Sequence, residues 1–137
     1  MQGPAWHGPS VREALDGVSA KEATDHPIVG AHSIWELVAH LTGSYRLVLR
    51  RLQGDDSPFQ PLEDWPPLPA PSDGNWERDV ATLISLNREI RDAVTDYPTA
   101  RLLEPIIADP PYSAFTQFIG LTQHDLYHAG QIVLLRR

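Results

Sequence analysis

The chain has 137 residues, a length that fits one domain (residues 1–137) with its own buried core. Its formal charge is −7 and it has no long run of Lys or Arg, which argues against nucleic acid or an anionic membrane as a partner. It has no cysteine, so disulfides and thiolate metal ligands are excluded.

The first elements are predicted to be short. Ser10 followed three residues later by Glu13 is a capping box, which predicts a helix over about 11–18. A second short helical turn is compatible with residues 19–22. The Pro and Gly that follow favour a loop over 23–31.

A long helix is predicted from residue 34 to about residue 52. Ser33 and Glu36 form its capping box, and no Pro interrupts it. Apolar residues recur at helical spacing and define a core face: Ile34, Leu37, Val38, Leu41, Tyr45, Val48 and Leu52. His40 lies at the edge of this face.

Residues 53–74 form a long Pro-rich loop between this helix and the next. Six prolines and five acidic residues fall within it, which argues against a helix and against a central strand. A loop of this length is uncommon in a small domain unless it is functional or disordered. Its aromatic residues, Phe59 and Trp65, favour a loop that packs back on the body of the protein as a lid.

Two more helices are predicted, over about 75–94 and 113–135. In the first, Asn87 lies among apolar positions and needs a hydrogen-bond partner if it is buried. The connection between the two helices holds one apolar stretch, 102–107, that suits a brief extended or paired segment. With three long helices, a short first one and no strong alternation of strand type, we expect an all-α fold, an antiparallel four-helix bundle.

Two histidines in the last predicted helix indicate a candidate metal site. His124 and His128 lie about 40° apart around a helix and about 6 Å apart along it, so both imidazoles can reach one ion. Taken alone, a pair at this spacing on an amphipathic helix favours ordinary packing or surface placement. The pair does not fit the zincin motif, in which Glu follows the first histidine, because Asp125 stands at that position. We expect Asp125 to be exposed.

A third histidine strengthens the metal hypothesis. If the helix over 34–52 packs beside the last one, His40 joins His124 and His128 in a three-imidazole site. Three protein ligands and an open position are typical of catalytic zinc. Without thiolates, nickel, iron or manganese also suit the ligand types, with zinc and nickel preferred.

The sequence gives weaker evidence for a functional role of the remaining candidate residues. Three more histidines stand at turns or beside a helix cap, where solvated or capping roles suit them better than ligation: His7, His26 and His32. Tyr127 is a candidate hydrogen-bond donor behind the ligands, or an interface or core residue. Gln131, on the same stripe as His124, is a candidate to hold a water or to bond nearby backbone. Trp35 and Trp76 are expected in the core.

Two segments of the chain resemble the DinB-like superfamily, the group that includes bacillithiol transferases. They are residues 124–132 (HDLYHAGQI) and 32–41 (HSIWELVAHL), and the Trp6-His7-Gly8-Pro9-Ser10 turn is similar to one branch of the group. The resemblance implies a four-helix bundle in which His40, His124 and His128 hold a divalent metal ion. It also implies a homodimer. One departure is that little precedes Trp6, whereas the family's first helix is usually long.

The resemblance leaves the reaction open. Some members are thiol S-transferases that use bacillithiol or mycothiol, one is a maleylpyruvate isomerase, and many have no known activity. We expect a metal-dependent enzyme, of thiol S-transferase or hydrolase type, with a low-molecular-weight thiol and a small-molecule substrate as partners. The alternatives are a non-catalytic bundle stapled by its metal and a stress-related interaction protein. No signal segment or apolar span is evident, so we expect a cytoplasmic location.

Overall fold

The computed structural model describes residues 8–137, and within that range every regular element is a helix. In chain order these are α1 (Val11–Leu15), α2 (Ala20–Thr24), α3 (Ile34–Leu52), α4 (Pro61–Asp64), α5 (Asp73–Asp96), the 3-10 turn η1 (Thr99–Arg101) and α6 (Ala114–Leu135). The prediction of an all-α fold is confirmed. Over the same residues, no helix is both long enough and apolar enough to cross a membrane.

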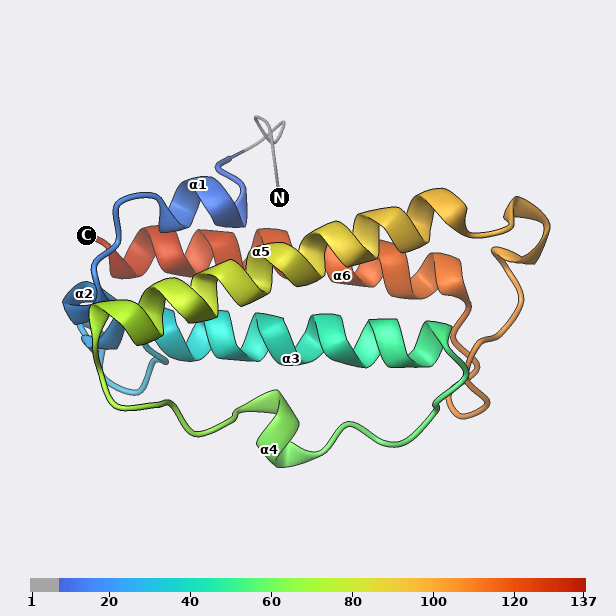
Figure 1. Ribbon diagram of the computed structural model, residues 1–137, viewed down its shortest axis with the longest axis horizontal. Coiled ribbons are helices and arrows are strands. Elements are labelled where there is room, and N and C mark those ends of the chain that lie inside the picture. Colours follow the sequence, from blue (N-terminus) through green and yellow to red (C-terminus); the bar gives the residue numbers. More distant parts are fainter. Residues whose placement is uncertain (1–7) are drawn as a thin grey trace.

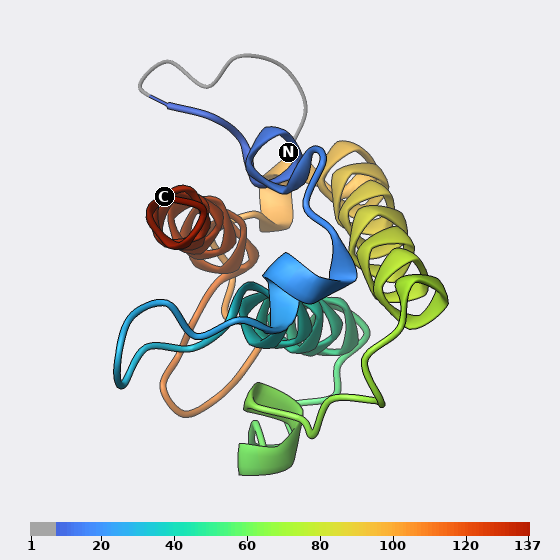
Figure 2. The same cartoon turned by 90° about the vertical axis from the view of Figure 1, so that its left-hand side faces the viewer.

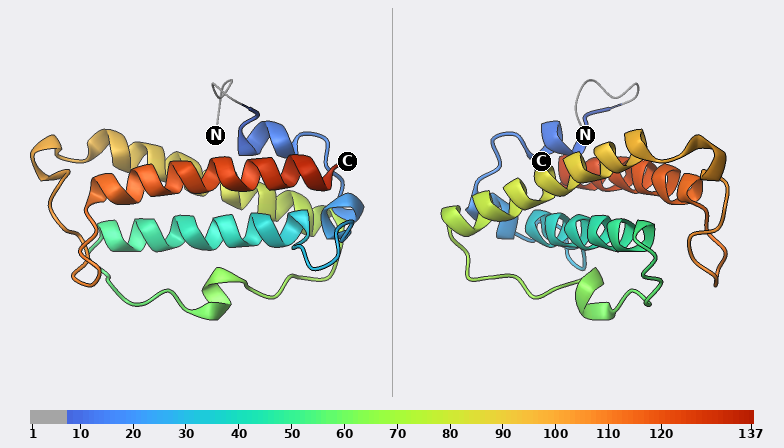
Figure 3. Two further views of the ribbon diagram at one scale, coloured as in Figure 1. Left: turned by 180° about the vertical axis from the view of Figure 1, so that it is seen from behind. Right: turned by 45° about the vertical axis from the view of Figure 1, so that its right-hand side comes forward.

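Three long helices lie side by side, with α3 in contact with both α5 and α6. Helices α3 and α5 run in the same direction and α6 runs in the opposite one, as Figures 1 and 3 show. The connection that carries α4 therefore returns along the outside of the bundle. The short α1 packs on α6 and covers one end of the remaining side, which is clear in the end-on view of Figure 2.

Serine caps define where most of these helices begin. The predicted capping boxes of α1 and α3 are present at Ser10 and Ser33, and the structure adds a third at Ser19 of α2; each serine pairs with the Glu three residues later. Helix α1 ends at Leu15, earlier than predicted. The reason is a turn after it, in which Gly17 has a φ of 71°, a conformation that costs other residues more.

The core is built on the apolar face of α3. Trp35 and Tyr45 are fully buried there, and Leu83 of α5 and Ile132 of α6 pack into the same cluster. The predicted core position of Trp76 is confirmed, because only 5% of it is exposed. Its indole Nε1 donates to the carbonyl oxygen of Val18 at 2.8 Å, so the loop after α1 is tied to α5.

The two long connections contain more order than the sequence indicated. One helical turn, α4, interrupts the Pro-rich loop, so the expectation of no helix there was wrong. Pro61 is compatible with it because it stands in the first turn, where its missing N–H has no intrahelical partner to lose. In the other connection, Pro105 pairs with Ser113 in an isolated antiparallel bridge, in line with the brief paired segment predicted there.

Candidate metal centre

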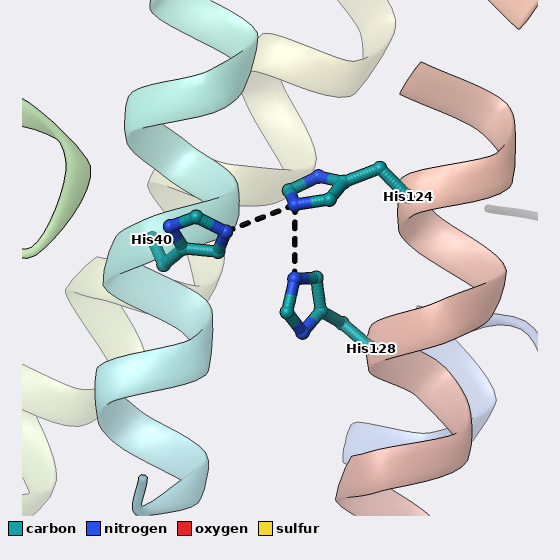
Figure 4. Close-up of side chains that lie close together, drawn as sticks. All are labelled: His40, His124 and His128. Carbon is teal, nitrogen blue, oxygen red and sulfur yellow. Dashed lines mark hydrogen bonds between the residues drawn. The ribbon is translucent and has the colours of Figure 1, made fainter. Parts of the chain in front are cut away.

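Three imidazoles from two helices converge between α3 and α6. The Nε2 atom of His124 lies 2.9 Å from that of His40 and 2.9 Å from that of His128 (Figure 4). One ligand atom from each residue can be chosen so that all three lie within 4.8 Å of one another. The structure therefore brings together the three histidines that the sequence singled out.

The second nitrogen of two of these rings is held by an acceptor. His40 Nδ1 lies 3.0 Å from the carbonyl oxygen and 2.8 Å from a carboxylate oxygen of Asp64. His128 Nδ1 lies 2.6 Å from Oε1 of Gln131. These oxygens only accept hydrogen bonds, so both Nδ1 atoms carry a proton. In the neutral rings, the lone pairs of Nε2 therefore face the centre, as metal ligation requires.

A cation fits this set of donors better than protons do. The Nε2 atom of His124 is 2.9 Å from the Nε2 atoms of both His40 and His128, but it can carry only one proton. That proton can be donated to one of these two nitrogens, and at the other contact two nitrogen lone pairs would face each other. A divalent ion accepts all three lone pairs at once. Ligands about 2.0–2.1 Å from a tetrahedral ion are roughly 3.4 Å apart, close to the spacing found here.

The protonation state of the rings agrees with ligation. Burial, together with the neighbouring His128 and His40, lowers the pKa of His124 to about 4. Burial also lowers the pKa of His128, although its bond with Gln131 acts in the opposite direction. Near pH 7 both imidazoles are therefore neutral and available to a metal ion.

An aromatic stack covers the outer side of the centre. Trp65, just after α4, stacks on His40 with ring centroids 4.2 Å apart. Its other face stacks on His32, with centroids 3.6 Å apart. The Pro-rich segment thus supplies a tryptophan cover and, through Asp64, a tether for one candidate ligand. His32, expected to be a solvated or capping residue, is half-exposed and belongs to this cover.

Close packing of backbone holds α4 against α3. A Cβ atom at Gly43 would overlap the backbone carbonyl oxygen of Glu63, so only glycine permits this approach. Arg50 of α3 forms an ion pair with the Glu63 side chain and donates to the carbonyl oxygen of Ser57 at 3.1 Å. These contacts place Asp64 and Trp65 over His40.

Asp125 was expected to be exposed, and that expectation was wrong. Tyr45 of α3 donates to its Oδ2 at 2.6 Å, and Asn87 of α5 donates to the Tyr45 hydroxyl at 3.2 Å. The carboxylate is turned inward because it faces Tyr45 of α3 on the side where Asn87 of α5 also approaches, while the histidines face His40, about one turn earlier on α3. Burial raises the pKa of Asp125 to about 6, against the opposing effect of the Tyr45 bond. Asn87 has the partner that its apolar surroundings required.

A cavity of about 440 Å³ adjoins the centre, with His128, Gln131, His32, Trp65 and Tyr127 among the residues that line it. Tyr127 presents its ring to His128 with centroids 5.0 Å apart and is 65% exposed. Gln131 contacts the candidate ligand His128 directly, through its Oε1 atom. Of the other histidines, His26 is half-exposed beside Glu36, and His7 lies outside the described residues.

Three residues of the centre were missed from the sequence as functional: Asp64, Gly43 and His32. The signal nearest to them was Trp65, an aromatic residue in a Pro-rich acidic segment, which indicated that the segment packs on the body. Asp64 was visible only as one of several loop acids. The close approach at Gly43 has no periodic signature in the sequence.

The comparisons with known proteins agree with this geometry. The model of the DinB superfamily matches residues 6–132, a span that includes all three histidines of the centre. No curated protein and no solved structure matches the chain significantly. The family match extends over nearly the whole sequence, and the chain belongs to the DinB superfamily.

Proposed function

We propose that the chain is a metal-dependent enzyme whose divalent cation is held by His40, His124 and His128. The observation that carries this proposal is the convergence of three Nε2 atoms, two of them on rings whose Nδ1 protons are tethered. Zinc and nickel suit the all-nitrogen donor set best, and iron and manganese are compatible with it. When bound there, such a cation acts as a Lewis acid and lowers the pKa of a bound water or thiol.

The reaction class we favour is thiol S-transfer or hydrolysis on a small molecule. Three protein ligands leave a four-coordinate ion one position for a non-protein ligand. The nearby protein groups prepare the site: Asp64 and Gln131 fix the orientation of two rings, and Trp65 screens His40 from water. The adjoining cavity gives a substrate, and a low-molecular-weight thiol where one is used, a route to the centre.

Metal analysis tests the proposal. Protein purified without a histidine tag should contain close to one divalent ion per chain, and His124→Ala should lose it. His26→Ala is the matched control, since that histidine is half-exposed and lies outside the centre. Equal metal content in the wild type and in His124→Ala would refute the site.

A second function is favoured by the position of the ligands in the chain. His40 and His124 are 84 residues apart, so an ion between them cross-links α3 to α6 and could serve as a structural staple. Under this alternative, a chelator should lower the melting temperature strongly, while added thiols should leave the absorption spectrum of bound Co²⁺ unchanged. Under the enzyme proposal, an added thiol should perturb that spectrum.

We also propose that the chain forms a homodimer through α6. Apart from the inward-turned Asp125, this helix contains no Asp, Glu, Lys or Arg. Its exposed apolar residues away from the cavity beside the metal centre are Phe115 and Ile119, and these would form the contact. Two copies that each carry a charge of −7 repel least across an uncharged face. Ile119→Lys should shift sedimentation toward the monomer, and Ser85→Lys, on exposed α5 surface, should not.

A further inference from the structure

The cavity beside the candidate metal centre has an uncharged lining. Its walls are apolar or aromatic, formed by Ile28, Leu37, Trp65, Tyr127, Leu134 and Leu135. Within the described part of the chain, none of the residues that line it is Asp, Glu, Lys or Arg. In the metal-free protein, a charged group that enters this cavity loses its hydration without gaining a side chain of opposite charge, which is costly.

The side-chain amide of Gln131 is one of the hydrogen-bond donors in this lining. The Oε1 atom of Gln131 accepts from His128 Nδ1 at 2.6 Å, so the orientation of the side-chain amide is fixed. Its NH₂ group has no hydrogen-bond partner among residues 8–137 and belongs to a residue that lines the cavity. A planar amide whose oxygen faces His128 Nδ1 turns its NH₂ group away from that ring, so the NH₂ group is free to donate to another acceptor.

The size of the cavity limits what it can hold. A cavity of about 150 Å³ is enough to bind benzene in a protein interior. The volume here, about 440 Å³, leaves room for one ring with a short substituent and is within the range of small-molecule sites. The exposed Tyr127 provides flat apolar surface for such a ring.

We propose that this cavity binds an uncharged, mainly apolar carbonyl compound, with its carbonyl oxygen accepting a hydrogen bond from the Gln131 NH₂ group. Gln131 is then a positioning residue with two contacts, one to the candidate ligand His128 and one to the substrate. The assignment of this molecule as the substrate rests on the proposed function, but its binding does not require the metal. In the metal-free protein, carboxylates of the same shape are disfavoured because the lining has no Lys or Arg and because the chain carries a net charge of −7.

A matched pair of probes tests the proposal. Methyl benzoate and benzoate differ at the charged group, and their dissociation constants can be measured by ligand-observed NMR on the zinc-free protein, where no cation is present to bind the carboxylate. Methyl benzoate should bind at least tenfold more tightly than benzoate. Benzoate binding as tightly as the ester, or no ester binding at all, would overturn the proposal.

Two variants test the Gln131 hydrogen bond and the uncharged lining separately. Gln131→Glu keeps an oxygen for His128 Nδ1 but removes the NH₂ donor, so it should weaken ester binding roughly three- to tenfold while retaining metal. Leu134→Arg, at a position 55% exposed, should raise the affinity for benzoate relative to the ester. Unchanged ester affinity in Gln131→Glu would refute the contact. If the wild-type protein binds no metal but still prefers the ester to benzoate, the proposed metal-dependent function is refuted and the binding proposal stands.

Discussion

The substitution Gly43→Ala tests how α4 is held against the metal centre. A Cβ at this position overlaps the backbone carbonyl oxygen of Glu63, and backbone cannot swing aside as a flexible side chain can. Helix α4 must therefore move away from α3. Because Asp64 ends α4 and Trp65 follows it, the tether and the aromatic cover of His40 move together.

The expected change in the unfolding free energy of Gly43→Ala is the sum of two opposing effects. Added bulk in a packed site costs about 1–3 kcal/mol, whereas Ala in place of Gly within a helix gains about 1 kcal/mol. Gly120→Ala provides the matched control, since a Cβ there meets no atom within 4 Å and only the gain remains. The two variants should therefore differ in unfolding free energy by about 1–3 kcal/mol. Loss of the Asp64 contact should also weaken metal binding roughly 10–100-fold.

Urea denaturation and chelator competition measure the two quantities on the same protein preparations. Gly43→Ala should be less stable than Gly120→Ala and should release metal to a weaker chelator. If both glycine variants are equally stabilised and bind metal as the wild type does, α4 does not support the centre in the way described.

Three further predictions concern other contacts. Tyr45→Phe removes the donor to a buried carboxylate and should cost about 1–3 kcal/mol in urea denaturation, whereas Tyr112→Phe, at an exposed position, should cost much less; equal costs would contradict the buried contact. Partial burial acts to raise the pKa of Glu36, but hydrogen bonds from Ser33 and His26 outweigh it and the pKa lies below the ordinary 4.5. The stability gained from that carboxylate is thus present above pH 4.5 and is lost as the pH falls below it. The difference in unfolding free energy between the wild type and Glu36→Gln should therefore shrink on acidification. A difference that does not change with pH would refute the role of Glu36 in the cap. Trp65→Ala should speed removal of metal by a chelator, measured by stopped-flow absorbance, while Trp35→Phe in the core should not; equal rates in the wild type and Trp65→Ala would show that the stack does not shield the centre.

Much of the fold could be predicted because its signals are local. Each Ser and the Glu three residues later define a helix start through contacts within one turn, and the apolar face of α3 repeats at helical spacing. The pairing of His124 and His128 is also local, since both lie on one helix. His40 could be added because its place at the edge of a core face limits where it can point.

Contacts set by the packing of distant segments could not be predicted in this way. The approach of α4 to α3 depends on a missing Cβ at Gly43, and only the folded structure reveals what that space admits. The burial of Asp125 depends on Tyr45 of α3 and, through it, on Asn87 of α5, 80 and 38 residues away in sequence. The stack of His32 on Trp65 joins segments 33 residues apart in sequence, with no periodicity to indicate it.

Titration of the metal-free protein with Co²⁺ tests the central claim most directly. The chain has no cysteine, so any thiolate-to-cobalt absorption must come from an added thiol and must report a position open to ligands. We predict that one equivalent of Co²⁺ binds to the wild type, that His124→Ala loses this binding, and that an added thiol produces the charge-transfer band. Cobalt binding that survives His124→Ala would contradict the three-histidine centre, and a bound ion that does not respond to thiol or to other small ligands would contradict its open position.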